Sequence, residues 1–465
     1  MNVTASTPEA YQLLHDGSLA LSQIEANGIR VDVEYLDGQL KEIGQQIKQL
    51  EAELRKSDVG RTWRREYGPK MNMGSGQQLG KILFDVMGFE TAGQTATGQH
   101  KTGATAIETV DHPFVRDYVQ LERLKKTRGT FLKGIQREVT SEGYVHVNFN
   151  LHTVSTFRSS SNAFNFQNLP IRDPEQGAIV RRCFIPRKKK NRIVEIDIGG
   201  AEVGIAACYH QDPRMIKYIK DPSKDMHRDM AAKCFHLKPG EVCKQTRYAA
   251  KNMFVFPQFY GDYYLNNATQ LWEFMERMDL TVKESDELLI QRLEDNGIYG
   301  RGACVPGEDT EDGTFEDHIK KIQNHFWDKL FPVYRDWKKA WYAEYRRNGY
   351  FVTKTGFRIE GDFGRNDVIN YPVQGSAFHC LLWVLIRIQR KLKKLRMRTK
   401  LIGQIHDSLV ADVPDNEVED YFGLVHEYMT KHLPRAWPWI IVPLEVEADV
   451  TPLGGTWHDK EPWDL

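Results

Sequence analysis

The stretch Arg192-Ile193-Val194-Glu195-Ile196-Asp197-Ile198-Gly199-Gly200-Ala201-Glu202 is the segment around which the chain is organised. A short β-branched run that ends in a carboxylate and two glycines predicts a buried strand followed by a tight turn, where the backbone can approach a ligand. The strand would present Asp197 at its end. Taken alone, the pattern also fits an ordinary strand that ends in an aspartate.

A second acid occupies a matching setting in Leu401-Ile402-Gly403-Gln404-Ile405-His406-Asp407-Ser408-Leu409-Val410-Ala411-Asp412-Val413. This segment is apolar on both sides of a polar centre, which predicts a hairpin with Asp407 at or near its tip. Two carboxylates at strand ends would repel each other by about 4 kcal/mol at a separation of about 4 Å, with an effective dielectric constant near 20. They need a cation between them, so the working hypothesis is a divalent-metal site.

Size and composition are those of a globular protein. The chain has 465 residues, of which 41% are hydrophobic, enough for about three domains or one multi-lobed body. Its 63 basic and 63 acidic residues cancel, so the total charge does not indicate a nucleic-acid partner, although a neutral total can hide a basic surface.

The six cysteines form no CxxC pair, which indicates a reduced intracellular chain without structural zinc. No apolar run approaches the roughly 20 residues of a membrane span, and no signal peptide is evident. We expect a soluble cytoplasmic protein without membrane contact.

Two expected helices carry clusters of positive charge. The first, 117–137, is rich in arginine and lysine. A solvated face explains most such runs, and a helix that contacts a phosphate backbone is the sharper alternative. The second places Arg247 and Lys251 four residues apart on one face, ahead of Phe256 and Tyr260. Two cations and nearby rings would suit a triphosphate and its base, whereas a solvated basic face with a packed aromatic end is the structural alternative.

Two further segments are rich in polar side chains. The loop 156–170 carries Arg, Ser, Asn and Gln, which suit hydrogen bonds to phosphate, sugar or base edges. The segment Asn370-Tyr371-Pro372-Val373-Gln374-Gly375-Ser376-Ala377 is expected to open an apolar helix over 378–389.

Taken in order, these motifs resemble those of the family A DNA polymerases, the DNA polymerase I-like enzymes. Asp197 with Glu202 five residues later is similar to the first catalytic motif, and Gln404 to Ser408 to the Val-His-Asp-Glu hairpin. The helix with Arg247, Lys251 and Tyr260 resembles the nucleotide-binding helix. The segments 156–170 and 370–374 resemble the Thr-Gly-Arg to Gln-Asn-Ile-Pro and Asn-x-Pro-x-Gln motifs. The match runs from about residue 10 to the C-terminus.

The resemblance implies a mixed α+β fold, a right-hand polymerase with palm, fingers and thumb built on an antiparallel palm sheet. The implied division of the chain is an N-terminal segment and thumb at 1–145, palm at 146–220, fingers at 221–348 with a phage-like insertion near 262–320, and palm again at 349–465.

The implied activity is template-directed DNA synthesis, in which dNTPs are added to a primer 3′-hydroxyl by two-metal-ion nucleotidyl transfer. Asp197, Asp407 and the carbonyl of Ile198 would bind two Mg²⁺ ions, for which Mn²⁺ could substitute. Lys251 would complete the catalytic set by donating a proton to the leaving group. The task would be replicative or repair synthesis.

Binding roles carry over in the same way. Glu202 would block a ribose 2′-hydroxyl and so select deoxynucleotides. The residues that would contact the incoming nucleotide are Arg172, Glu202, His227, Arg247, Lys251, Phe256 and Tyr260. The residues that would hold primer and template are Arg158, Gln167, Asn168, Asn370, Gln374 and His406.

The chain departs from the family pattern at several positions. Lys251 and Tyr260 are nine residues apart, where the family spacing is eight, which predicts a π-bulge or a break near Pro257. The variant motif Phe254 to Gly261 resembles phage members of the family.

The segment ahead of the thumb is too short for a proofreading domain, so we expect a polymerase domain without exonuclease. The substituted positions are Phe157 for glycine, Gly199-Gly200 for Ser-Gln, Gly204 for arginine and Ser408 for glutamate.

Two alternatives remain open at this point. A single-subunit RNA polymerase would share the His-Asp-Ser triplet at 406–408, and Glu202 argues for DNA synthesis instead. A catalytically degenerate hand could serve as a DNA-binding subunit, although Asp197, Asp407 and the two cations of the helix are retained. Expected partners are primer-template DNA and dNTPs. A separate helicase, exonuclease or processivity factor is compatible with the sequence. We expect a monomer, in the host cytoplasm if a phage encodes it.

Overall fold

The computed structural model describes residues 2–91, 93–95, 97–162, 164–170, 173–302 and 310–463. Its centre is a five-stranded antiparallel sheet in the order β12-β11-β6-β10-β9. The strands are β6 (Asn191–Ile198), β9 (Lys400–Ile405), β10 (Ser408–Pro414), β11 (Val446–Val450) and β12 (Glu461–Pro462). The predicted strand and hairpin are therefore confirmed, because β6 is flanked by β10 and β11, and β9 and β10 form the hairpin.

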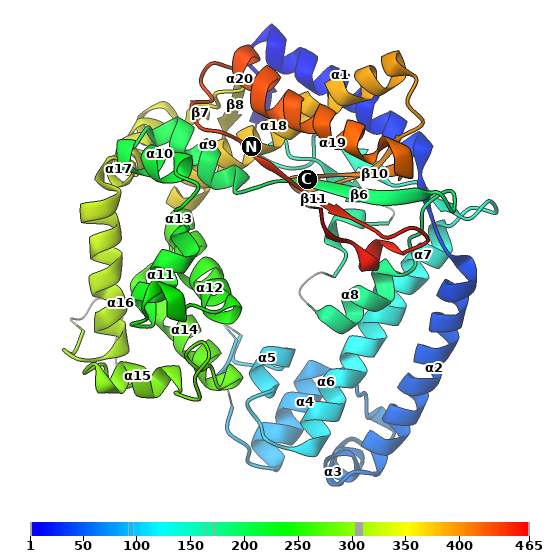
Figure 1. Cartoon of the computed structure of the whole chain (residues 1–465). Coiled ribbons are helices and arrows are strands. Elements are labelled where there is room, and N and C mark those ends of the chain that lie inside the picture. Colours follow the sequence, from blue (N-terminus) through cyan, green and yellow to red (C-terminus); the bar gives the residue numbers. More distant parts are fainter. Residues whose placement is uncertain are drawn as a thin grey trace.

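Helices cover the upper side of this sheet in Figure 1. Helix α1 (Pro8–Asn27) packs on β9, and α19 (Val418–Glu427) packs on β10 and β11. The longest helix, α18 (Arg365–Leu395), contacts both α1 and α9 (Ala201–His210). Because helices and neighbouring strands enclose β10, all its residues are buried. A smaller three-stranded sheet, β1-β8-β7 (Asn2–Ala5, Phe357–Glu360 and Tyr350–Val352), lies beside this body.

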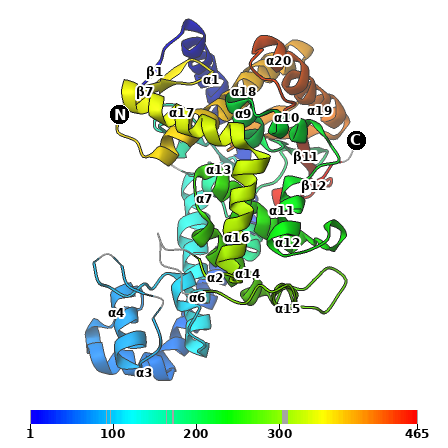
Figure 2. The same cartoon turned by 90° about the vertical axis from the view of Figure 1, so that its left-hand side faces the viewer.

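Two helical arms extend from the sheet on opposite sides of Figure 1. One contains α2 (Val33–Lys56) and α6 (Pro113–Lys126), with α3 (Asp58–Tyr67) and α4 (Gly76–Gly80) at its far end, as Figure 2 also shows. Asp32 caps α2, since its carboxylate accepts the Tyr35 amide at 3.0 Å. The other arm contains α11 (Met226–Cys234), α12 (Lys244–Ala250), α14 (Tyr264–Met278), α15 (Leu289–Asp295), α16 (Phe315–Asn324) and α17 (Pro332–Asn348).

The helix that carries Arg247 and Lys251 contains the predicted irregularity. It runs as α12, then a π-helical turn over Lys251–Val255, then α13 (Phe256–Tyr260). The π turn absorbs the extra residue between Lys251 and Tyr260 just ahead of Pro257. Gly261, with φ of 92°, ends the helix in a conformation that favours glycine.

Helix α18 begins earlier than the sequence indicated. Residues 370–377 were expected to precede the helical body, but α18 starts at Arg365 and holds Pro372 in its interior. A proline leaves the carbonyl four residues back without its helical donor. Here the indole of Trp341 donates to that carbonyl, the oxygen of Val368, at 3.0 Å. A side chain from another helix therefore compensates for the proline, and sequence periodicity could not reveal this.

None of the helices in the described ranges is both long enough and apolar enough to cross a membrane.

Candidate active site

The sheet brings Asp197 and Asp407 to neighbouring positions. Asp197, the penultimate residue of β6, pairs with Ser408 of β10. Asp407, which precedes Ser408, therefore lies beside it at the hairpin tip. The amide of Ile198 donates to the carbonyl of Asp407 at 3.3 Å. His406 supplies the sharp turn, with φ of 48°.

The charges at this tip act on each other. The pKa of Asp197 is raised to about 6. The main cause is partial desolvation by the protein around the carboxyl, although the residue as a whole is exposed, and the negative charges of Asp407 and Glu195 add to it. Glu195 lies two residues earlier on the same strand face, and Glu447 of β11 lies directly opposite Asp197. The repulsion anticipated from the sequence is therefore present, and a cation would relieve it.

The donor set fits a hard divalent cation. Aspartate carboxylates and backbone carbonyls are oxygen ligands of the kind that Mg²⁺ prefers. Within the described ranges, no three His, Cys, Asp or Glu side chains form a group that could hold a metal ion. Two carboxylates with the Ile198 carbonyl would thus leave coordination positions for water or substrate oxygens.

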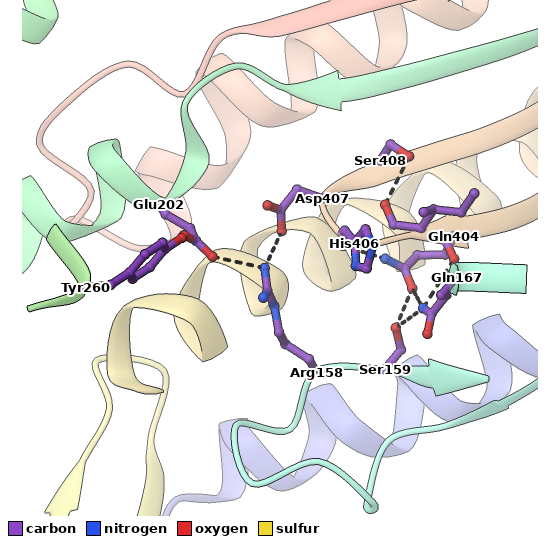
Figure 3. Close-up of polar contacts among 10 residues, drawn as sticks. Arg158, Ser159, Gln167, Glu202, Tyr260, Gln404, His406, Asp407 and Ser408 are labelled. Atoms are coloured by element: carbon purple, nitrogen blue, oxygen red, sulfur yellow. Dashed lines mark hydrogen bonds and ion pairs between the residues drawn. The ribbon is translucent and has the colours of Figure 1, made fainter. Parts of the chain in front are cut away.

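Arg158 links the acids of the site, as Figure 3 shows. One terminal nitrogen of its guanidinium lies 3.1 Å from the Asp407 carboxylate and 3.3 Å from that of Glu202. All three side chains are largely buried. Arg158 therefore supplies positive charge where the two carboxylates approach each other.

Phe157, in front of Arg158, adopts a strained backbone conformation. Its φ is 53°, which explains why the family motif has glycine at this position. Its ring is buried and lies 4.9 Å from the ring of Phe357, centroid to centroid. In this chain, aromatic packing offsets the strain.

We expect Phe157→Gly to destabilise the protein by about 2 kcal/mol. Loss of a buried phenylalanine costs about 3 kcal/mol or more, and relief of the left-handed backbone returns only about 1 kcal/mol. Urea denaturation would measure the difference. Gln211→Gly is the matched control, because Gln211 has φ of 54° but an exposed side chain. That variant should be more stable than the parent chain, and stabilisation by both glycines would contradict the packing role of Phe157.

Glu202 is held by direct contacts from Tyr260 and Arg158, and Asn370 supports Tyr260. Glu202 lies in the first turn of α9, whose N-cap Gly200 has φ of 60°, a left-handed conformation that glycine adopts at low cost. The hydroxyl of Tyr260, on α13, donates to the carboxylate of Glu202, and Arg158 contacts its other oxygen. The amide of Asn370, on α18, donates to the Tyr260 carbonyl at 3.3 Å. Burial raises the pKa of Glu202, which the contacts from Tyr260 and Arg158 oppose.

Five of the seven predicted nucleotide-contacting side chains lie between α11 and α13: His227, Arg247, Lys251, Phe256 and Tyr260. Arg247 donates to Asp225, the N-cap of α11, at 2.7 Å. The Lys251 ammonium lies 5.4 Å from the centre of the Phe256 ring. The His227 ring packs edge-on against the same Phe256 ring, with 5.7 Å between the two ring centres. Burial and the charges of Arg247 and Lys251 lower the pKa of His227 to about 4. His227 is therefore a neutral imidazole at pH 7, and its buried Nδ1 has no hydrogen-bond partner in the described chain.

A second polar network fixes the loop 156–170 to the hairpin (Figure 3). The buried amide of Gln167 donates to the side-chain oxygens of Ser159, at 2.8 Å, and Gln404, at 2.9 Å. Gln404 in turn donates to the His406 carbonyl at 2.6 Å. This network orients the hairpin tip that carries Asp407.

The remaining predicted residues are placed as follows. Asn370 and Gln374 line a narrow cavity with Glu202 and Tyr260, and Asn168 is exposed in a 3₁₀ turn. Arg172 lies outside the described residues. Sequence reasoning missed the structural roles of Ser159, Gln404, Glu195 and Glu447. Of these, Glu195 could have been found from strand alternation, because it precedes Asp197 by two residues.

Ser408 shows how the chain accommodates the missing glutamate. Its hydroxyl donates to the Ile405 carbonyl at 3.0 Å and is 3.2 Å from the carboxylate of Glu195. Glu195 also accepts from Trp457 and Lys460. An acid of the adjacent strand therefore lies beside the position where the family has its glutamate.

Comparison with known proteins identifies the class. The chain belongs to DNA polymerase family A, whose sequence model matches residues 33–285 and 310–459. It is 27% identical over 449 residues to DNA polymerase I of Bacillus subtilis (strain 168), covering 96% of this chain and 45% of that protein. It is 28% identical over 448 residues to thermostable DNA polymerase I of Thermus aquaticus, covering 93% and 46%. The chain spans about half the length of the curated relatives it matches.

A solved structure shows the same fold. The POL domain of Pol1 from M. smegmatis, in complex with DNA primer-template and dNTP, superposes with a TM-score of 0.73 at 24% identity, covering 96% of this chain and 70% of that one. The expected mixed α+β right-hand fold with antiparallel sheets is confirmed. The relatives named are bacterial polymerases, so the likeness to phage members stays a prediction.

Proposed function

We propose that the chain is a DNA-directed DNA polymerase, which adds dNTPs to the 3′-hydroxyl of a primer on a DNA template. The observation that carries the proposal is the placement of Asp197 and Asp407 side by side at the sheet end, in a member of a polymerase family. Glu202, held by Tyr260 and Arg158 near these acids, favours DNA over RNA synthesis. The test is primer extension with dNTPs or rNTPs, and equal use of both would refute the assignment.

The metal site would consist of Asp197, Asp407 and the carbonyl of Ile198, with two Mg²⁺ ions or Mn²⁺ as substitute. When bound, such ions lower the pKa of an attacking hydroxyl and neutralise the charge that develops on the phosphates. The Arg158 guanidinium lies 3.1 Å from the Asp407 carboxylate, so it would have to move or share this carboxylate when a cation binds.

The cations of α12 and the π turn would bind the triphosphate. Arg247 uses its Nε for Asp225. Its terminal nitrogens form no ion pair within the described ranges, so they could contact phosphate oxygens. Lys251 would contact the same phosphates and donate a proton to the leaving pyrophosphate, while Phe256 would stack on the base or sugar. We include the neutral His227 and Arg172 in this set on the family resemblance.

Primer and template would be held by the opposite side of the site. We assign this role to Arg158, Gln167, Asn168, Asn370, Gln374 and His406. In this proposal 1–145 forms the thumb with its N-terminal segment, 146–220 and 349–465 the palm, and 221–348 the fingers with an insertion near 262–320. The basic side of α6 would contact the phosphate backbone.

We expect divalent-cation binding to weaken about tenfold for each pH unit below pH 6. The pKa of Asp197 rises from its ordinary value of 3.8 to about 6, so below this pH a proton competes with the cation for the carboxylate. In the metal-free chain the same shift makes stability fall as pH rises from 3.8 to about 6, because the folded state then binds more protons than the unfolded state. Titration calorimetry with Mn²⁺ from pH 5 to 8 would measure the binding trend. Asp197→Asn should remove the trend, and flat affinity in the unmodified chain would contradict it.

A further inference from the structure

Lys338 is a buried cation that the proposed chemistry does not use. It lies on α17 with 6% of its surface exposed. Within the described ranges no carboxylate forms an ion pair with it. Burying an unpaired ammonium is costly, so its contacts need an explanation.

The ammonium of Lys338 points toward the end of α13. Its Nζ lies 3.5 Å from the backbone carbonyl of Gln258. It also lies 3.3 Å from the centre of the Trp327 ring and 5.2 Å from that of Tyr334. Lys338 is thus held by two aromatic faces and directed at one carbonyl of the nucleotide-facing helix.

Gln258 is the centre of a buried polar network at this point. Its side-chain oxygen accepts the Trp327 indole N–H at 2.6 Å. Its side-chain nitrogen donates to Asn267 at 2.6 Å and to Gln323 at 2.8 Å. Trp327 therefore contacts both Gln258 and Lys338, and links the side-chain network to the cation.

The turn that Gln258 occupies needs such external support. α13 has only five residues, follows a π-helical turn and contains Pro257, which has no amide hydrogen to donate. The last carbonyls of a helix carry partial negative charge, which a cation stabilises. Tyr260, two residues after Gln258, makes the contact with Glu202.

We propose that Lys338 is a positioning residue that fixes the last turn of α13, so that Tyr260 meets Glu202 and the site discriminates between incoming nucleotides. The proposal rests on the proposed polymerase function. It assigns to Lys338 no contact with substrate: its effect passes through Gln258 to Tyr260.

The surroundings make this contact sensitive to pH. Burial and the charge of Arg365, at the start of α18, lower the pKa of Lys338 to about 7. His210 of α9 is neutral, since burial and the charge of Lys338 lower its pKa to about 3. Tyr334 stays protonated because burial and the charge of Glu202 raise its pKa. The ammonium is therefore the group in this set that titrates near neutrality.

The test compares Lys338→Met with Lys339→Met. Methionine keeps the aliphatic volume and removes the charge and the donor, and Lys339 is the exposed neighbour on the same helix. We expect Lys338→Met to raise the urea midpoint of unfolding, because an unpaired buried charge is removed. At pH 6.5 it should lower kcat/KM for the correct dNTP about tenfold and reduce discrimination against rNTPs and mismatched dNTPs. Lys339→Met should change neither.

A pH series separates positioning from simple packing. The ratio of parent to Lys338→Met kcat/KM should fall from about ten at pH 6.5 toward one at pH 9, as the parent lysine loses its proton. If parent and Lys338→Met have the same kcat/KM at every pH, the proposal is overturned. It is also overturned if Lys338→Met is less stable than the parent by enough to explain its lower activity. If the parent chain extends no primer, the polymerase function itself fails, and that outcome is distinct from an active parent matched by an equally active Lys338→Met.

Discussion

Asp407→Asn is expected to reduce primer extension at least about 10³-fold, which corresponds to about 4 kcal/mol of transition-state stabilisation. The amide keeps the size of the side chain but removes one of the two carboxylates that the sheet places together. Single-turnover extension at saturating Mg²⁺ would measure the loss. Fluorescence anisotropy with labelled primer-template should show DNA binding within about threefold of the parent, because the change removes a metal ligand and not a phosphate contact.

A matched control tests whether Asp407 is special among the acids of the site. Glu447 faces Asp197 across β6 and β11 but lies outside the proposed ligand pair. Glu447→Gln should therefore retain activity within about tenfold. If Glu447→Gln is as inactive as Asp407→Asn, then Glu447 also belongs to the catalytic site and the proposal of Asp197 and Asp407 as the only side-chain ligands is wrong. Asp407→Asn should also lower the pKa of Asp197 toward its ordinary range, because one of the charges that raise it is removed.

The sequence predicted the parts of the site that depend on local pattern. β-branched residues before Asp197 and the apolar flanks of Asp407 fixed β6 and the hairpin, and antiparallel pairing then brought the two acids together. The spacing of Lys251 and Tyr260, compared with that of the family, predicted either a π-bulge or a break near Pro257, and the structure has the π turn.

Contacts between distant segments could not be predicted in this way. The Trp341 indole, from another helix, satisfies the carbonyl that Pro372 leaves free in the interior of α18. Lys338 and Lys339 are identical in type and adjacent in sequence, yet one is buried and the other exposed. Helical spacing places Lys338 on the same face of α17 as the buried Tyr334 and Tyr345. Its contact with the Gln258 carbonyl depends instead on how α17 packs against α13, which the local sequence does not encode.

Glu202→Ala is expected to raise the use of ribonucleotides relative to deoxynucleotides about 10²-fold. A side chain that must be displaced to admit one extra hydroxyl group imposes a cost of about 1–3 kcal/mol, and alanine removes the obstacle. The measurement is kcat/KM for dNTP and rNTP on the same primer-template. The parent chain should strongly prefer dNTP. A variant that loses activity equally with both sugars would show that Glu202 supports the site without reading the sugar.

Tyr260→Phe keeps the Glu202 carboxylate but removes one of the contacts that hold it in place, so it tests whether sugar selection depends on the position of Glu202. The hydroxyl of Tyr260 donates to Glu202, while Arg158 holds the other carboxylate oxygen. Loss of the hydroxyl frees one side of the carboxylate at a cost of about 1 kcal/mol, so discrimination should weaken about fivefold, well short of Glu202→Ala. Combining Tyr260→Phe with Glu202→Ala should then add nothing further, because the hydroxyl acts on sugar selection through the carboxylate. Additive effects of the two changes would instead mean that Tyr260 contacts the nucleotide on its own account.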